Sequence, residues 1–400
     1  MNAPVESLRR MRRSWSGVLD PFRNNKFLRW GAIVLVIAFI AVFPLFFGPL
    51  SGMVDASTTA LAYVVMALGL NIVVGFAGLL DLGYVAFYAL GSLTMGWLGS
   101  SFAYQINHGK GIHIGVSSVL PGIHLNFLLV LVAAVIVCAL AGILIGLPTL
   151  RLRGDYIAIV TLAFGEIVYR FALNGDQLKI NGYQLTNGAQ GITPIDPVNL
   201  PFVNQFSSLN LDLKPWYFTG LALVFIALFI NIRVRDSRLG RAWIAIREDE
   251  VAAASMGVPL VKTKLMAYAT GAAFGGTAGA FLGSYLNTVN AEQFQFSFSI
   301  FVLSMIILGG LGSIWGVALG AVALTFVNRY LIPNVLNPIA KDSFNFDLTQ
   351  LSFSIFGFLL VIMMLTRPEG LLPERRRKLE LTEGIGTGDT EGVGVIEVRA

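Results

Sequence analysis

Long apolar runs, each about twenty residues in length, recur along most of this chain of 400 residues. A helical run of that length crosses the roughly 30 Å hydrocarbon core of a bilayer. In lipid every backbone polar group has to be satisfied within the segment, which favours helices. The pattern predicts an all-α, polytopic membrane protein with about ten transmembrane helices. The predicted spans are 31–50, 57–75, 82–102, 125–147, 155–173, 215–233, 264–286, 296–311, 314–333 and 350–366.

The composition agrees with this class and argues against several others. Charged residues make up 13% of the chain, against about 25% in ordinary soluble domains. A single cysteine, Cys138, excludes an intrachain disulfide and disfavours a metal–thiolate site. The spacing of the three histidines, His108, His113 and His124, matches no metal-binding pattern, so no metal site is predicted. The net charge of +5 follows membrane topology and does not indicate nucleic acid.

Lysine and arginine are distributed unequally between the two sides of the predicted spans. If the N-terminus is cytoplasmic, 22 of the 28 basic residues lie on the inner side and four lie in the outer loops. The positive-inside rule therefore predicts that both termini are cytoplasmic. On this basis the chain divides into a basic N-terminal extension, 1–30, a transmembrane domain, 31–372, and a cytoplasmic tail, 373–400.

The two terminal segments carry no predicted chemistry. The span that follows residue 30 is too long for the apolar core of a cleavable signal peptide, so we expect it to be retained. The tail is rich in Gly, Glu and Thr without apolar periodicity and is predicted to be disordered. Its first basic residues, Arg375 to Lys378, are expected to contact anionic membrane lipid.

Two spans carry glycines at every fourth residue. Residues four apart share one helix face, and a glycine face lets another helix backbone approach closely. We predict tight helix packing at these faces, or two surfaces that slide between states. The residues are Gly271, Gly275, Gly279 and Gly283 in the seventh span, and Gly312, Gly316 and Gly320 at the ninth.

One charged residue is predicted to lie near the bilayer midplane. Glu166 follows Asp155 by eleven residues, which is about 16 Å along a helix. A charge there costs about 2.5–3.5 kcal/mol on insertion scales, so it normally faces protein or water. Arg170, one turn later, offers a within-helix ion pair as one interpretation. The other is that Glu166 lines a polar path, for which Asn71 and Asp81 are further candidates.

A polar, helix-prone stretch, residues 241–257, interrupts the apolar spans in the most basic loop. Acidic residues before an alanine run and the following Gly257 are helix start and stop signals. They predict a helix over about 249–256, preceded by another over about 239–246. Helices this short are unstable alone in water. They either pack against the membrane domain with no partner or, as we favour, connect it to a separate motor subunit.

The chain lacks a phosphate-binding loop of its own. The pattern G-x-x-x-x-G-K-[ST] needs a lysine followed by Ser or Thr, and only Lys262 satisfies this. The required glycines fall on Met256 and Val261, so the pattern fails. If ATP drives this protein, another chain hydrolyses it.

Five sequence blocks, taken in order, resemble one protein family. They are GLNIVVGFAGLLDLGYVAFYALGS (69–92), RLRGDYIAIVTLAFGEIVYR (151–170), LGRAWIAIREDEVAAASMGV (239–258), GGLGSIWGVALGA (309–321) and RPEGLL (367–372). Together they are similar to the LivM-type permease of bacterial branched-chain amino acid ABC importers, over about residues 31–372. The resemblance implies the ABC importer permease fold, with one helix, four helices, a linking helix and four more. Spans two and seven would run in opposite directions, so the two groups of four are expected to form an inverted repeat.

The resemblance also implies partners. They are a second, LivH-type permease, two ABC ATPases that carry ATP–Mg, and a periplasmic substrate-binding protein, at the bacterial inner membrane. The chain itself is expected to be a translocation subunit, without enzymatic activity or a cofactor of its own. ATPase coupling is assigned to the segment 234–263, through Gly240, Arg241, Arg247, Glu250, Ala252, Ala253 and Gly257. The outer loop, 174–214, partly keeps the family pattern T-G-G-x-x-G-I as Thr186, Asn187, Gly188, Gly191 and Ile192.

The predicted function is ATP-driven import of leucine, isoleucine and valine by alternating access, with the solute delivered by the binding protein. One alternative is an ABC permease for urea, short amides or another small solute. Another is an ion-coupled secondary transporter that uses Glu166 as its proton carrier.

Overall fold

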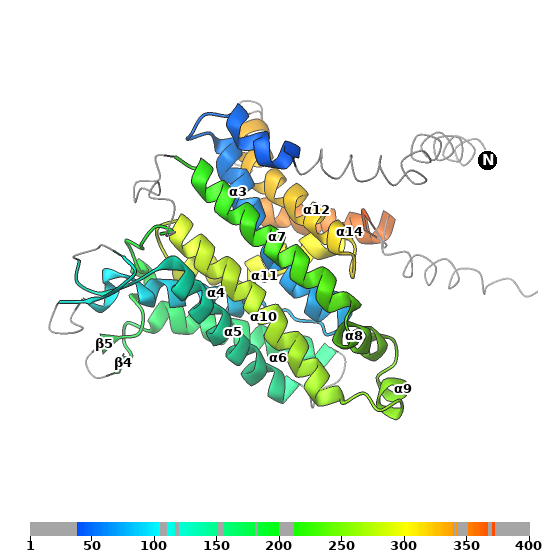
Figure 1. Ribbon diagram of the computed structural model, residues 1–400. Coiled ribbons are helices and arrows are strands. Elements are labelled where there is room, and N and C mark those ends of the chain that lie inside the picture. The colour runs from blue at the N-terminus through cyan, green and yellow to red at the C-terminus, as the bar shows by residue number, and fades with distance from the viewer. Residues whose placement is uncertain are drawn as a thin grey trace, which may run out of the picture.

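The computed structural model describes residues 38–104, 110–116, 120–149, 155–180, 183–199, 212–338, 341, 351–366 and 370–372. The N-terminal extension 1–30, the tail 373–400, residues 31–37 of the predicted span 31–50, and His108 lie outside the described residues. The described chain is a bundle of tilted helices (Figure 1). Short strands lie at one end of the bundle, and two short helices lie at the other.

Six helices among the described residues are long and apolar enough to cross a membrane. Two of them combine an α-helix with a π-helical continuation. The chain is therefore a mostly helical, multi-pass membrane protein. The six are α3 (Gly52–Leu70) with η2 (Asn71–Phe76), α5 (Phe127–Thr149), α6 (Asp155–Asn174), α7 (Lys214–Asp236), α10 (Leu260–Tyr285), and α12 (Ile314–Phe326) with η7 (Val327–Leu336).

Three further apolar helices are shorter: α4 (Val85–Leu98), α11 (Phe296–Gly309) and α14 (Ser352–Thr366). Fourteen residues, the length of α4 and of α11, rise only about 21 Å, less than the hydrocarbon core. The prediction of a single helix over 82–102 was therefore wrong in length. At its far end the chain leaves the helix at Gly99 to enter a strand, and its first residues precede the helix.

The strand end of the bundle contains two small sheets. Strands β1 (Gly99–Ser100), β2 (Ile112–Ile114) and β3 (Ile123–Leu125) form a sheet in the order β1-β3-β2, with β1 antiparallel and β2 parallel to β3. Strands β4 (Lys179–Ile180) and β5 (Tyr183–Gln184) form an antiparallel pair. The opposite end contains α8 (Arg238–Glu248) and α9 (Glu250–Ser255), which follow α7 directly (Figure 1).

The helix α10 packs against α3, α4 and α5. Its glycines let neighbouring helices come within backbone contact: a Cβ at Gly279 would overlap the carbonyl of Tyr88 in α4. At α12, Gly316 and Gly320 lie against the backbone of α11. Gly312 differs from the other predicted glycines, because it lies in the turn before α12 with a φ of 84°. Small residues thus set the spacing between these helices.

The helices α3 and α10 begin at opposite ends of the bundle. Before α3, the Pro49 carbonyl accepts a hydrogen bond of 3.1 Å from Leu213 N, next to the start of α7. The chain continues from α3 through η2 to the α8 end, where the Gly75 carbonyl accepts a hydrogen bond from Arg247. Since α10 follows α8 and α9 directly, it starts where η2 ends.

Candidate functional site

The α8–α9 element, residues 237–258, is a helix–turn–helix with a side-chain cap at each start. Ser237 Oγ accepts from Gly240 N at 3.2 Å, and Asp249 Oδ1 accepts from Val251 N and Ala252 N at 2.9 Å each. Gly257 has a φ of 86°, the left-handed conformation that glycine adopts without steric cost after a helix. Two short helices are present where two were predicted. Asp249 caps the start of the second helix, whereas the prediction placed it inside that helix.

Two buried side chains anchor this element to α10. Trp243 is fully buried, and its Nε1 donates to the Thr263 carbonyl at 2.7 Å. Lys264, also buried, forms an ion pair of 2.7 Å with Glu250 at the start of α9. Each short helix therefore has its own attachment to the first turns of α10.

Arg247 connects the same element to the end of α3–η2. Its Nη1 donates to the Gly75 carbonyl at 2.6 Å, and its aliphatic stem packs against Gly78. Gly240 fits the tight turn between α7 and α8, where a Cβ would overlap the carbonyls of Val234 and Arg235. Of the predicted coupling residues, Arg247 and Gly240 thus lie against the transmembrane helices.

Arg241 contacts the end of α7: its Nη1 donates to the carbonyl of Asp236, the last residue of that helix, at 2.8 Å.

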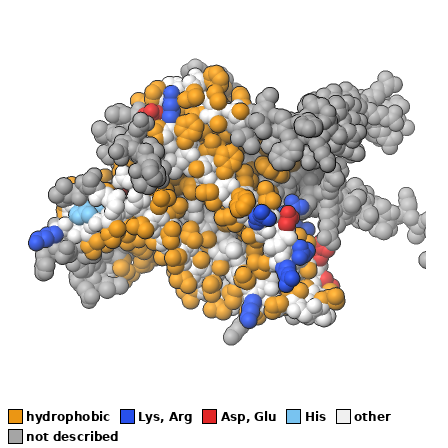
Figure 2. Space-filling view, in the orientation of Figure 1, with side chains coloured by type: hydrophobic (Ala, Val, Ile, Leu, Met, Phe, Trp, Pro, Cys, Tyr) orange, Lys and Arg blue, Asp and Glu red, His pale blue; other side chains and the backbone are white. Residues whose placement is uncertain are grey.

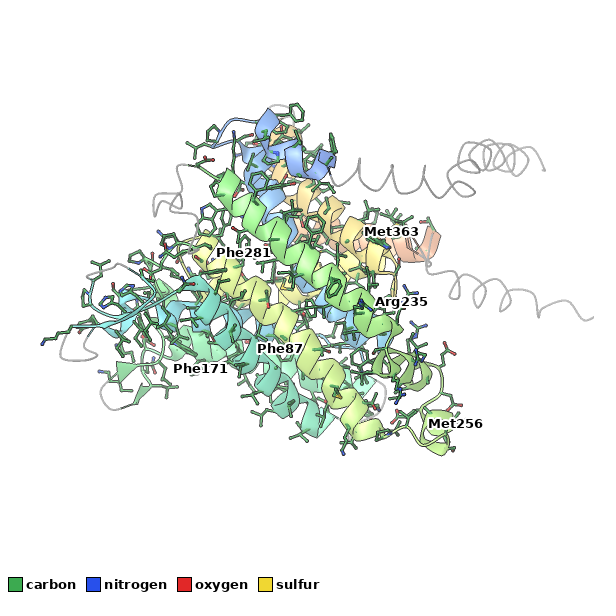
Figure 3. The ribbon with its side chains drawn as sticks, viewed as in Figure 1. Phe87, Phe171, Arg235, Met256, Phe281 and Met363 are labelled. Carbon is green, nitrogen blue, oxygen red and sulfur yellow. The ribbon has the colours of Figure 1, made fainter. Side chains whose placement is uncertain are left out.

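The outer side of α9 is exposed and partly apolar. Val251 is 72% exposed and Met256 is 86% exposed, and Figure 3 shows Met256 at the tip of α9, away from the bundle. In Figure 2, Lys and Arg side chains gather around this end, whereas hydrophobic side chains dominate the middle of the same face. Ala252 is exposed and Ala253 is buried toward the bundle. The element therefore has an inner side anchored to the bundle and an exposed outer side.

Glu250→Lys is expected to detach α9 from α10, because it would place a second ammonium beside the buried Lys264. Hydrogen–deuterium exchange of residues 250–255 should become about tenfold faster, equivalent to about 1.4 kcal/mol. Glu250→Gln is the matched control, since its amide oxygen still accepts from Lys264. Equal exchange rates in the two variants would mean that the ion pair does not hold α9.

At mid-bundle, the short helices α4 and α11 begin beside each other. The Val85 amide at the start of α4 donates to Ser299 Oγ, in the first turn of α11, at 3.1 Å. The Tyr88 ring packs against Phe294 and Phe298, with centroids 5.7 and 5.2 Å apart. From this meeting point α4 runs to the strand end and α11 runs toward the α8 end. Paired short helices of this kind often flank the solute site of a transporter.

Asn71 and Asp81, two predicted path residues, are buried beside these helices. Asn71 Oδ1 accepts from Gly312 N at 3.0 Å, so it ties η2 to the turn between α11 and α12. Its Nδ2 has no hydrogen-bond partner among the described residues. Asp81 Oδ1 accepts from Gly83 N at 2.9 Å, just before α4. Asn71 thus joins two segments of the fold, Asp81 binds within its own loop, and neither side chain faces an open surface.

Glu166, the third predicted path residue, is on the surface of α6. Its Oε1 accepts from Arg170 Nε at 2.7 Å, and the two side chains are 42% and 62% exposed. The neighbouring Gly165 packs against Gly83, so Glu166 lies at the level where α4 begins. The within-helix ion pair is therefore present, and it stands at mid-bundle on an exposed face.

The loop after α6 is folded against the end of α10. Thr186 Oγ1 donates to the Ala172 carbonyl at 2.9 Å, and Ile192 pairs with Val289 through two backbone hydrogen bonds. Asn187, which stands where the family pattern has glycine, has a φ of −95° and donates to the Gly191 carbonyl. A side chain is accommodated there without strain, so this departure leaves the loop intact.

Several contacts have no signal in the sequence pattern. The segment 370–372 is hydrogen-bonded to the end of α11. Leu371 N and Leu372 N donate to the carbonyls of Leu308 and Gly309. At the strand end, His124 pairs with Asp196 at 2.7 Å. Among the described residues, no group of three His, Cys, Asp or Glu side chains is close enough to hold a metal ion.

Comparison with known proteins gives consistent results. A family model described as "Branched-chain amino acid transport system / permease component" matches residues 52–365. The chain is 38% identical over 358 residues to the high-affinity branched-chain amino acid transport system permease protein LivM of Salmonella typhimurium, covering 84% of this chain and 74% of that protein. It is 27% identical over 338 residues to the probable LivM of Methanocaldococcus jannaschii, covering 78% and 91%.

A weaker similarity extends to a second kind of permease. The chain is 24% identical over 333 residues to the permease protein LivH of Salmonella typhimurium, covering 81% of this chain and 95% of that protein. No solved structure matches the chain significantly.

Proposed function

This chain belongs to the family of branched-chain amino acid transport system permease components, and from that premise we propose that it imports leucine, isoleucine and valine as the LivM-type subunit of an ATP-driven transporter. The observation that carries the proposal is the α8–α9 element. It is capped at both helices, anchored to α10 and η2, and exposes an apolar tip formed by Val251 and Met256. An ATPase on a separate chain would need a docking element with these properties.

We infer the partners of this chain from its relatives and from the structure of the α8–α9 end and the strand end of the bundle. The similarity to both LivM and LivH supports a pair of related permeases in one complex. Two ATPases, with ATP–Mg bound to them, would dock at the α8–α9 end. A periplasmic binding protein would dock at the strand end, where the loop 186–192 is held against α10. We place the α8–α9 end and both termini on the cytoplasmic side of the inner membrane, because residues 233–264 carry seven of the 28 lysines and arginines.

We further propose ten spans arranged as an inverted repeat. The groups would be α3, α4, α5, α6 and α10, α11, α12, α14, joined by α7, with the predicted span 31–50 preceding them. Two observations support this arrangement. The groups begin at opposite ends of the bundle, and the second helix in each group is a short one of 14 residues. Short helices at corresponding positions are typical of transporter repeats.

A continuous set of contacts can carry motion from an ATPase to the mid-bundle. Closure of the ATPases would displace α8, and Arg247 would pass this displacement to the end of η2. At the start of η2, Asn71 binds the turn between α11 and α12 through Gly312. Movement of this turn would shift α11 relative to α4 and expose the central path on one side at a time. This is alternating access driven from the cytoplasmic end.

Reconstitution with the partner chains tests the proposal. The complex of this permease, the LivH-type permease, both ATPases and the binding protein should accumulate leucine in proteoliposomes only when ATP is supplied. Valine and isoleucine should compete, whereas urea should not. Uptake driven by a proton gradient with no ATPase bound to the purified chain would overturn the proposal and favour ion-coupled transport.

A further inference from the structure

The exposed face of α6 differs in chemistry from those of neighbouring spans. Every exposed residue of α5 is apolar, from Leu128 to Pro148, and those of α7 are apolar up to its last turn. On α6 the exposed stripe begins with Tyr156, Ile159 and Ala163 and then combines Ile167 with polar residues. Its polar half contains Glu166, Arg170 and Asn174, spaced four residues apart, with the exposed Ile167 beside Glu166.

The depth of this polar half excludes contact with lipid tails. Glu166 is eight residues before the end of α6 at Asn174, or about 12 Å along the helix, and eleven after its start. A charged pair facing hydrocarbon at that depth would be costly, whereas the exposed faces of α5 and α7 are apolar at the same depth. The polar half of α6 therefore faces water or the second permease.

The polar half of α6 also lies where a solute path would be expected. It leads from the loop after α6, at the strand end, down to Glu166. There α6 meets the start of α4 through Gly83 and Gly165, and it also contacts η6 (Ala291–Phe294), just before α11. Beyond Glu166 the stripe returns to apolar side chains. The charged pair is thus the innermost polar group on a line from the outer surface to the meeting point of the short helices.

From this placement we infer that Glu166 and Arg170 form an exchangeable site for the charged head of an amino acid in transit. The guanidinium of Arg170 would bind the solute carboxylate, for which its planar donor set is suited. The carboxylate of Glu166 would bind the solute ammonium. Without solute the two side chains satisfy each other at 2.7 Å. A zwitterion replaces that one ion pair with two, so no charge is left unpaired at either stage.

This inference rests on the proposed function and assigns it a specific recognition step. The head group is common to all amino acids, so the site would select the zwitterion while the side chain is selected elsewhere. Ile167, 59% exposed and adjacent to Glu166, would contact the aliphatic part of the solute. A purely structural ion pair would not bind the solute and would not require it to be a zwitterion.

Charge reversal distinguishes a solute site from a structural pair. The double variant Glu166→Arg with Arg170→Glu keeps an ion pair but exchanges the positions of its charges. In the reconstituted full complex it should reduce ATP-driven leucine uptake at least tenfold, as should Glu166→Gln, while ATP hydrolysis stimulated by the loaded binding protein stays within twofold. Uptake restored to the native level by the double variant would overturn the inference. A native complex without any ATP-driven leucine uptake would instead contradict the proposed function.

A thiol probe gives a second readout that does not depend on uptake. The chain's one native cysteine, Cys138, is buried, so Ile167→Cys would supply a single reporter thiol next to the pair. A water-soluble maleimide should label it in the full complex. Leucine delivered by the binding protein during ATP hydrolysis should slow labelling at least fivefold, whereas ATP with the unloaded binding protein should not. Failure to label, or labelling that leucine does not slow, would show that this face is not the path.

Discussion

Replacing Gly279 by alanine is expected to destabilise the folded chain, because this glycine lies where the backbones of α10 and α4 touch. A Cβ at this position would overlap the Tyr88 carbonyl and approach Ser92 N of α4, so two helix backbones have to move apart. Ser92 Oγ also donates to the Gly279 carbonyl at 3.0 Å, and this hydrogen bond would be strained. Overpacking of this kind costs about 1–3 kcal/mol. Because α10 also packs against α3 and α5, the shift would spread through the bundle.

Thermal unfolding of the purified protein in detergent measures this effect. The matched control is Gly357→Ala in α14, where a Cβ would meet nothing within 4 Å. That control is expected to unfold at or slightly above the native temperature, because alanine favours the helix. Similar melting temperatures for the two variants would show that Gly279 does not set the distance between α10 and α4.

Replacing Trp243 by alanine is expected to reduce transport strongly while leaving the bundle inserted. The side chain is fully buried between α8 and α10, and its indole donates to the Thr263 carbonyl. Loss of a buried tryptophan costs about 3–5 kcal/mol, which is more than the remaining contacts of such short helices can offset. The α8–α9 element should then become mobile. ATP-driven leucine uptake should fall at least tenfold.

Trp315→Ala is the control for this variant, since Trp315 is 61% exposed at the start of α12. Both variants should insert and co-purify with the second permease, and only Trp243→Ala should lose uptake. Trp243→Phe should be intermediate, because it keeps most of the packing and loses the hydrogen bond. Native uptake in Trp243→Ala would contradict the role assigned to α8.

The sequence predicted the features that depend on local chemistry. Helix capping is one of these, because Asp249 and Gly257 interact with residues only two or three positions away. The apolar runs likewise predicted the long spans α5 and α7, where a single hydrophobic segment crosses the bundle.

Features that depend on distant contacts could not be predicted in the same way. The predicted span 82–102 continues past Gly99, yet the chain leaves the helix there because Gly99 pairs with His124 of β3. Asn71 was predicted to be a path residue because it is polar at membrane depth, and that prediction did not reveal its partner, Gly312, which is 241 residues away. Polarity at depth indicates that a side chain has a partner, and only the fold shows which one.

The position of Glu166 illustrates the same limit. Its spacing from Arg170 predicted the ion pair that the structure contains. Exposure of that pair on one face of α6 depends on how α4, α5 and η6 cover the other faces. The structure therefore shows that the ion pair is exposed, which the spacing of the two residues alone does not predict.

The central claim is that a separate ATPase binds the exposed tip of α9, and site-specific crosslinking tests it directly. Because Cys138 is buried, Met256→Cys labelled with benzophenone maleimide would place one photoreactive group at that tip. Illumination of the assembled complex should yield one covalent product with the mass of this chain plus one ATPase. Leu144→Cys, exposed on the apolar face of α5, should yield none. Absence of the product from Met256→Cys, or its formation from both variants alike, would contradict the account.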